Sequence, residues 1–148
     1  MKQEDIPGKW WTAPAEADNG DLILVTGRSD VKKFRDNPRF KIRVEVTWRY
    51  ATHGLPEENS NEASILEQAD AGFHSVLKAD PIAVLTGIFT GDGLRTWVFY
   101  TTSTHIFQKK LNEALAPLPM LELEIIAEND PEWLAYKEME EARIEEGE

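Results

Sequence analysis

The chain has 148 residues, of which 41% are hydrophobic and 29% charged, and this size and balance predict one globular domain over residues 1–148. The net charge of −11 argues against direct nucleic-acid binding, because phosphates repel an acidic surface, and no apolar run is long enough for a membrane span. The absence of cysteine excludes disulfides and thiolate chemistry, and without a signal-peptide-like start we expect a cytoplasmic protein.

The N-terminal part predicts a β-hairpin followed by a short helix or an ordered loop. Residues 9–14 and 21–27 are apolar runs of strand length, and Asn19-Gly20 between them favours the positive φ angles of a tight turn. Residues 28–38 are polar and end in Asn37-Pro38, a pair that blocks helix formation just before the next strand.

The clearest strand runs from Phe40 to Tyr50, where apolar and polar residues alternate without a break. Its apolar face carries Phe40, Ile42, Val44, Val46, Trp48 and Tyr50. Its other face carries Lys41, Arg43, Glu45, Thr47 and Arg49. Because an isolated strand cannot offset the entropy of ordering its backbone, we expect neighbouring strands beside it and helices across its apolar face.

Residues 62–79 change to a helical period, with apolar side chains recurring every three or four positions. Ser60 or Asn61 is the expected N-cap, and Asp80-Pro81 ends the helix. We place Asp70 among the polar residues around the apolar stripe, as a surface neighbour of His74.

Residues 82–90 and 94–102 predict a second hairpin around Gly91-Asp92-Gly93. A tight turn explains these glycines better than a phosphate-binding loop does. A phosphate-binding loop leads into a helix, whereas here a second strand is expected after the glycines. A second helix is then expected after Ser103 or Thr104, ending before Pro117.

The C-terminal part predicts a strand over residues 120–128 and a last helix that starts within Asn129 to Trp133. Glu122 and Glu124 alternate along this strand, where they would face the basic side of the strand from Phe40. We expect an ordered core over about 9–138, and an acidic tail, about 139–148, that frays.

These elements follow the order strand, helix, strand, strand, helix, strand. That order predicts an α+β fold, a ferredoxin-like β-α-β-β-α-β sandwich with helices on one face of an antiparallel sheet. An added N-terminal β-hairpin and a short C-terminal helix complete the prediction. In this topology the strand from Phe40 is the neighbour of residues 94–102.

The positive charges gather in one segment, because residues 28–49 hold eight of the sixteen Lys and Arg residues. They either form a solvated face paired with carboxylates or make an anion or partner site. Exposed aromatic residues beside arginines are the second candidate for a binding surface, unless the last helix uses them to dock on the sheet. The candidate anion or partner contacts are Lys41, Arg43, Arg49, Arg95, Trp133 and Tyr136.

Nothing in the sequence identifies catalytic, cofactor-binding or metal-binding residues. His53, His74 and His105 do not have the spacing of metal ligands, and a catalytic triad is defined in space rather than by sequence position. We therefore expect no cofactor, and the sequence favours a protein that is not an enzyme without deciding the question.

The order and spacing of several short motifs resemble the domain of unknown function 695 family. The motifs are Val46-Thr47-Trp48-Arg49-Tyr50, Gly54-Leu55-Pro56, Glu62 with Asp70, Thr86-Gly87, Arg95 to Tyr100, and Asp130 to Tyr136. The closing Asp-x-x-Trp-x-x-Tyr pattern is also similar to that of the regulator of ribonuclease E activity B, an acidic ferredoxin-like protein inhibitor. The resemblance implies the fold and supplies no catalytic residues.

Three functional hypotheses remain. The first is an interaction or regulatory module whose acidic surface binds a basic protein partner, such as a nuclease or a toxin. The alternative is a small-molecule or anion-binding domain, with or without enzyme activity, that uses a basic pocket on the sheet face. The third is a homodimer formed through a sheet edge or face.

Overall fold

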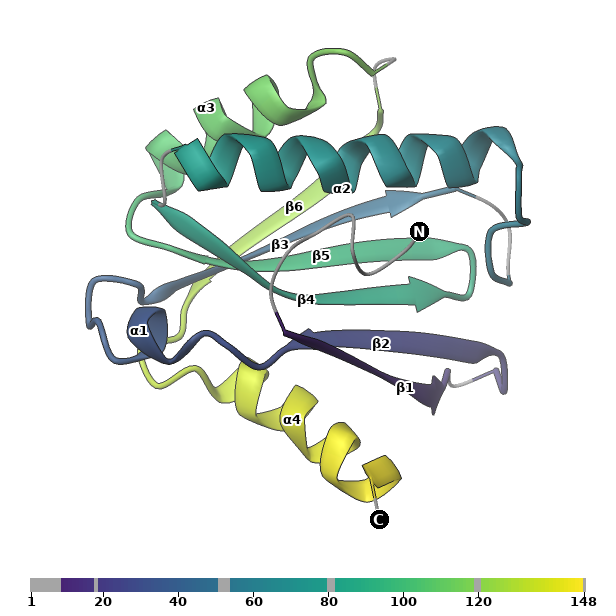
Figure 1. Cartoon of the computed structure of the whole chain (residues 1–148), viewed down its shortest axis with the longest axis horizontal. Coiled ribbons are helices and arrows are strands. Elements are labelled where there is room, and N and C mark those ends of the chain that lie inside the picture. The colour runs from purple at the N-terminus through teal and green to yellow at the C-terminus, as the bar shows by residue number, and fades with distance from the viewer. Residues whose placement is uncertain (1–8, 18, 51–53, 80–81, 119–120, 148) are drawn as a thin grey trace.

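The computed structural model describes residues 9–17, 19–50, 54–79, 82–118 and 121–147 (Figure 1), and the side chains among them other than those of residues 79 and 142–147. The strands within these ranges are β1 (Trp10–Glu16), β2 (Leu22–Arg28), β3 (Ile42–Arg49), β4 (Ala83–Gly91), β5 (Leu94–Thr101) and β6 (Leu123–Asn129). The helices are α1 (Lys32–Arg35), α2 (Asn61–Ala79), α3 (Thr104–Leu115) and α4 (Leu134–Gly147).

The fold is of the mixed α+β class, with one antiparallel six-stranded sheet in the order β1-β2-β4-β5-β3-β6. The predicted pairing of β3 with β5 is confirmed, with Val44 opposite Phe99 and Val46 opposite Trp97. Both predicted hairpins are confirmed as well. The N-terminal hairpin extends the sheet beyond β4, so the strand order differs from that of a four-stranded ferredoxin-like sheet.

Helices cover both faces of the sheet, whereas the sequence predicted helices on one face only. Figure 1 shows α2 and α3 on one side and α4 with α1 on the other. The first core, under α2 and α3, contains Val44, Val46, Leu66, Phe73, Trp97, Phe99, Phe107 and Leu111. The second core, under α4, contains Val25, Val31, Phe40, Val84, Tyr100, Trp133, Tyr136 and Met139. The sheet therefore has no fully solvated face.

Phe40 belongs to the second core, although the alternation placed it on the same face as Val44. The reason is local, because β3 begins only at Ile42 and the preceding residues form a turn. The Phe40 N–H donates to the Asn37 carbonyl at 3.1 Å, which turns the chain before the strand starts. The alternation was correct within β3 and wrong at Phe40, two residues before the strand begins.

The long helices begin and pack as their sequences predict. Ser60 caps α2 by accepting the Ala63 N–H at 3.1 Å, and Ser103 caps α3 by accepting the Ile106 N–H at 3.3 Å. Gly72 lets α2 and α3 approach closely, since a Cβ built there would lie 2.3 Å from a backbone carbonyl oxygen of α3. The two helices therefore form one tight layer over the first core.

The last helix includes a buried residue of the segment that was expected to fray. Helix α4 continues through Gly147, and Met139 within it is buried in the second core. The sequence predicted a fraying tail from about residue 139, because the later segment has few apolar residues. Met139 reaches the sheet at Gly87, where a Cβ would meet its sulfur at 2.5 Å.

Candidate functional site

Asp130 positions the last helix. Its carboxylate accepts the backbone N–H groups of Leu134 at 2.8 Å and Ala135 at 3.1 Å, so it caps the first turn of α4. The same carboxylate accepts the Tyr100 hydroxyl at 2.7 Å. Trp133, just before the helix, has a positive φ of 56°, which explains why α4 starts at Leu134 and not within residues 129–133 as predicted.

Trp133 and Tyr136 dock α4 on the sheet. The Trp133 ring is 1% exposed and stacks on Tyr100 with centroids 4.0 Å apart, while its Nε1 donates to the Phe40 carbonyl at 2.7 Å. Tyr136 is 4% exposed, and its hydroxyl donates to the Arg28 carbonyl at 2.6 Å. Both residues were candidate partner contacts, with docking of the last helix on the sheet as the other interpretation, and the second interpretation describes what the two rings do here. Trp133 is buried, and Tyr136 keeps a small exposed part beside α4.

Arg43 is surrounded by carboxylates. Its guanidinium pairs with Glu45 at 2.9 Å, Glu128 at 3.2 Å and Asp130 at 3.2 Å, and its side chain is 17% exposed. Burial alone would raise the pKa of Asp130, but the hydrogen bond from Tyr100, the two backbone N–H groups and the Arg43 guanidinium hold that pKa below its ordinary value. At Arg43 the polar face of β3 is therefore an ion cluster, in which three carboxylates surround one guanidinium, rather than a free basic surface.

Arg95 lies on the opposite face of the sheet and pairs with Asp70 of α2. Arg95 Nη2 donates to the Asp70 carboxylate at 2.6 Å, and Trp97 Nε1 donates to its other oxygen at 2.7 Å. Asp70 is 0% exposed, so the prediction that it lies on the surface beside His74 is wrong. Burial raises the pKa of Asp70, against the opposing effects of Arg95 and Trp97.

The predicted basic pocket is not assembled. Lys41 and Arg49 are exposed at the two ends of β3, Arg43 faces α4, and Arg95 faces α2. A cavity of about 660 Å³ does border Arg95 at the start of α2. Its lining also includes Glu58 and Glu67, so it is not a basic pocket of the kind predicted.

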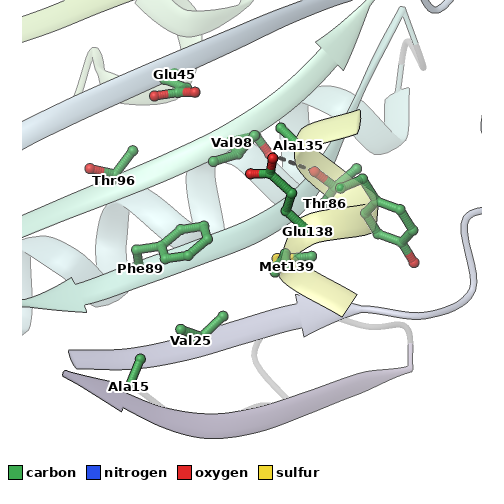
Figure 2. Close-up of a pocket in the computed structure, with 11 residues that line it drawn as sticks. Ala15, Val25, Glu45, Thr86, Phe89, Thr96, Val98, Ala135, Glu138 and Met139 are labelled. Atoms are coloured by element: carbon green, nitrogen blue, oxygen red, sulfur yellow. Dashed lines mark hydrogen bonds between the residues drawn. The ribbon is translucent and has the colours of Figure 1, made fainter. Parts of the chain in front are cut away.

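A second cavity, of about 510 Å³, lies between α4 and the sheet (Figure 2). We call it the α4 groove, and it is lined by Ala15, Val25, Glu45, Thr86, Phe89, Thr96, Val98, Ala135, Tyr136, Glu138 and Met139. It exists because α4 packs on β1, β2 and β4, whereas Glu45 and Thr96 belong to β3 and β5. The sheet beside the helix is thus left partly open.

The α4 groove combines an apolar floor with two carboxylates. Figure 2 shows Glu138 reaching from α4 over the sheet near Val98, with Glu45 on the strand beyond Thr96. Glu138 is exposed, and the Glu45 side chain is 33% exposed with Arg43 on one side of it. Thr86 is not available as a donor because its hydroxyl donates to the Val98 carbonyl at 3.2 Å. The groove is suited to a ligand that is cationic at one end and aliphatic along its length.

Sequence reasoning missed Glu138, Glu45 and Asp70 as residues of interest. Glu138 sits in an acidic run, and Glu45 was assigned only to the polar face of a strand. Asp70 had a usable signal, since it lies four residues after Leu66 and three before Phe73, both of which are buried in the first core. That spacing places Asp70 on the buried face of α2.

The described part of the chain contains no cluster of three or more His, Asp or Glu side chains arranged to hold a metal ion. His74 is partly buried on α2 and His105 is exposed on α3, whereas His53 lies outside the described residues. None of the helices described here has the length and apolar character needed to cross a membrane.

Comparison with known proteins places this chain in a family. Residues 9–139 match the family described as a family of unknown function (DUF695). No curated protein and no solved structure gives a match. The matched range runs from β1 to the buried Met139, so it includes both cores, Asp70 with Arg95, and the α4 groove. The chain belongs to the DUF695 family.

Proposed function

We propose that this protein is an interaction module, and that its α4 groove binds a basic protein partner such as a nuclease or a toxin. The observation that carries the proposal is the pair of carboxylates, Glu45 and Glu138, above an apolar floor in a chain with a net charge of −11. The proposal includes a cytoplasmic location, where such partners are made.

The chemistry of the groove favours a lysine or arginine side chain of the partner. Its aliphatic stem would pack on Val98 and Met139, while its charged head would lie near the Glu138 carboxylate. The long-range field of an acidic protein also speeds the encounter with a basic partner, and this effect weakens as salt screens it. A basic partner would therefore bind in a salt-sensitive way.

The test is capture of partners by the immobilised protein from a lysate of its own host, at low and at moderate salt. Glu138→Gln should reduce the captured basic protein, because it removes one groove charge and changes little else. Glu141→Gln is the matched control, since Glu141 is exposed on α4 and does not line the groove. If capture is insensitive to salt, or if both variants behave alike, the α4 groove is not the binding site.

We also propose that the segment from β3 to β6 is a ferredoxin-like unit, and that the family is distantly related to the regulator of ribonuclease E activity B. The strand order β4-β5-β3-β6, with α2 and α3 on one face, supports the first part. The Asp130, Trp133 and Tyr136 pattern supports the second. A solved structure of that regulator in which the equivalent aspartate does not cap a docked helix would contradict the kinship.

The alternative, anion or small-molecule binding, has one supporting observation. Arg95 is 5% exposed and borders a cavity of about 660 Å³ with Ser60 and Ser64. Thermal shift measurements with millimolar phosphates and carboxylates test it, because a ligand that binds only the native state raises the unfolding temperature. A shift that is lost in Ser64→Ala would support this alternative, and the absence of any shift would remove it.

A further inference from the structure

Strand β6 ends the sheet, and its outer backbone edge has no strand beside it among the residues that the structure describes. Six of its seven residues are exposed. An open edge of this kind presents backbone N–H and C=O groups that can pair with another chain. The side chains on its two faces then decide which chain fits.

The register shows which backbone groups point outward. Asp130, just after β6, donates its N–H to the Lys41 carbonyl at 2.7 Å, and the same register continues through the strand. In an antiparallel pair, alternate residues exchange both hydrogen bonds with the neighbour, so the even-numbered residues of β6 bond to β3. The N–H and C=O groups of Leu123, Ile125 and Ala127 are therefore directed outward.

The face of β6 toward α3 is apolar and hollowed. A cavity of about 230 Å³ is lined there by Val44, Thr104, Phe107, Gln108, Leu111, Ile125 and Ala127. Ile125 is 47% exposed at the rim of this cavity. A residue of an added strand that pairs with Ile125 or Ala127 would direct its side chain to this same face, because paired residues share a face of the sheet. The cavity would accept an aliphatic side chain.

The opposite face of β6 is acidic. Glu124 and Glu128 are both exposed, Glu128 also pairing with Arg43 of β3, and Ile126 between them is 44% exposed. Residues of an added strand opposite these glutamates would be four positions apart and would point to the acidic face. Opposite charges directly across a strand pair are favourable, whereas like charges are unfavourable, so these positions select lysine or arginine.

We propose that a basic protein partner adds an extended segment to β6 as an antiparallel strand. Its sequence would read basic, apolar, any residue, apolar, basic. The two basic residues would lie opposite Glu124 and Glu128, and the two apolar residues would point into the cavity of about 230 Å³ beside α3. The inference rests on the proposed function in taking the partner to be basic. It goes further by naming a second surface and the conformation in which the partner binds.

The test uses a fluorescent peptide containing Arg-Val-Thr-Val-Arg between glycine and serine flanks, with binding followed by fluorescence anisotropy. We expect saturable binding that weakens about fivefold or more when both valines are N-methylated, because they supply the N–H groups that pair with β6. N-methylation of the threonine is the matched control and should change nothing, since its N–H points away from β6. A peptide with the reversed alternation, Val-Arg-Thr-Arg-Val, should bind more weakly.

Two protein variants separate this inference from the proposed function. Glu124→Gln with Glu128→Gln should weaken peptide binding, whereas Glu141→Gln, which removes an exposed charge outside both surfaces, should leave it unchanged. Strand addition is overturned if N-methylation of the valines has no effect on peptide binding. If the peptide does not bind while capture from lysate depends on Glu138, strand addition is wrong and the α4 groove remains the proposed binding site. If the peptide does not bind and capture from lysate does not depend on Glu138, the proposed function is wrong as well.

Discussion

Arg95 Nη2 lies 2.6 Å from the Asp70 carboxylate, with both side chains almost fully buried between α2 and the sheet. A buried ion pair is costly to break, because the remaining charge has neither water nor a partner. Asp70→Asn should therefore lower the free energy of unfolding by about 3–5 kcal/mol, measured by urea denaturation. Asp36→Asn, in an exposed pair with Lys32, should cost less than about 1 kcal/mol. Equal effects of the two variants would contradict a structural role for Asp70.

The pH dependence of stability should depend on Asp130. Its pKa is lower in the folded state than its ordinary value of 3.8, so its carboxylate contributes stability at neutral pH. The folded state loses this contribution as the pH falls below 3.8 and through the folded pKa. Asp130→Asn should lower the free energy of unfolding at pH 7 by about 1–3 kcal/mol. The gap between the unfolding free energies of wild type and variant should narrow toward pH 2. A gap that stays constant with pH would show that the charge is unimportant.

Trp133 should be the most sensitive residue of the second core. Trp133→Ala removes a fully buried ring and should lower the free energy of unfolding by about 3–5 kcal/mol. Trp133→Phe keeps an aromatic ring on Tyr100 but leaves the Phe40 carbonyl without its donor, so we expect a loss of about 1–3 kcal/mol. Leu134→Ala, at a residue 56% exposed, should change stability by less than about 0.5 kcal/mol. Urea denaturation followed by far-ultraviolet circular dichroism, which reports the backbone, measures the unfolding free energies of all three variants.

Gly72→Ala sets two effects against each other. Alanine favours a helix by about 1 kcal/mol over glycine, yet its Cβ would lie 2.3 Å from the Ala114 carbonyl oxygen of α3. Backbone cannot move aside as a side-chain tip can, so the clash should win and the variant should be less stable by about 1–3 kcal/mol. Ser75→Ala, at an exposed position of the same helix, gives a propensity gain without a clash, smaller than that of glycine to alanine because serine is the better helix former of the two. A more stable Gly72→Ala variant would mean that α2 and α3 are further apart.

The elements were predictable because their signals are local. The alternation in β3, the serine before each long helix and the glycines of the β4-β5 turn depend on residues close together in the sequence. Docking of the last helix through its aromatic residues was one of the two interpretations of the sequence, but the face of the sheet that it covers was not predictable, because α4 joins Trp133 to Phe40 from a distant part of the chain. The burial of Asp70 likewise depends on Arg95, which becomes its neighbour only when β5 pairs into the sheet.

The candidate site was less predictable than the fold. Lys41, Arg43 and Arg49 of the predicted pocket are close together in the sequence, but Arg95 comes from β5, and the sheet places Arg43 and Arg95 on opposite faces. The α4 groove depends on where α4 lies across the sheet, and no residue type signals that position. Composition did indicate the acidic character that the groove and the β6 edge share.

The second core also has a consequence for biosynthesis. Val25, Val31, Phe40 and Tyr100 belong to this core, yet the helix that covers them contributes Trp133, Tyr136 and Met139. On the ribosome, these apolar residues are therefore synthesised before the helix that covers them. During that interval the nascent chain exposes a sheet face rich in aromatic and branched residues, which is the kind of surface that molecular chaperones bind.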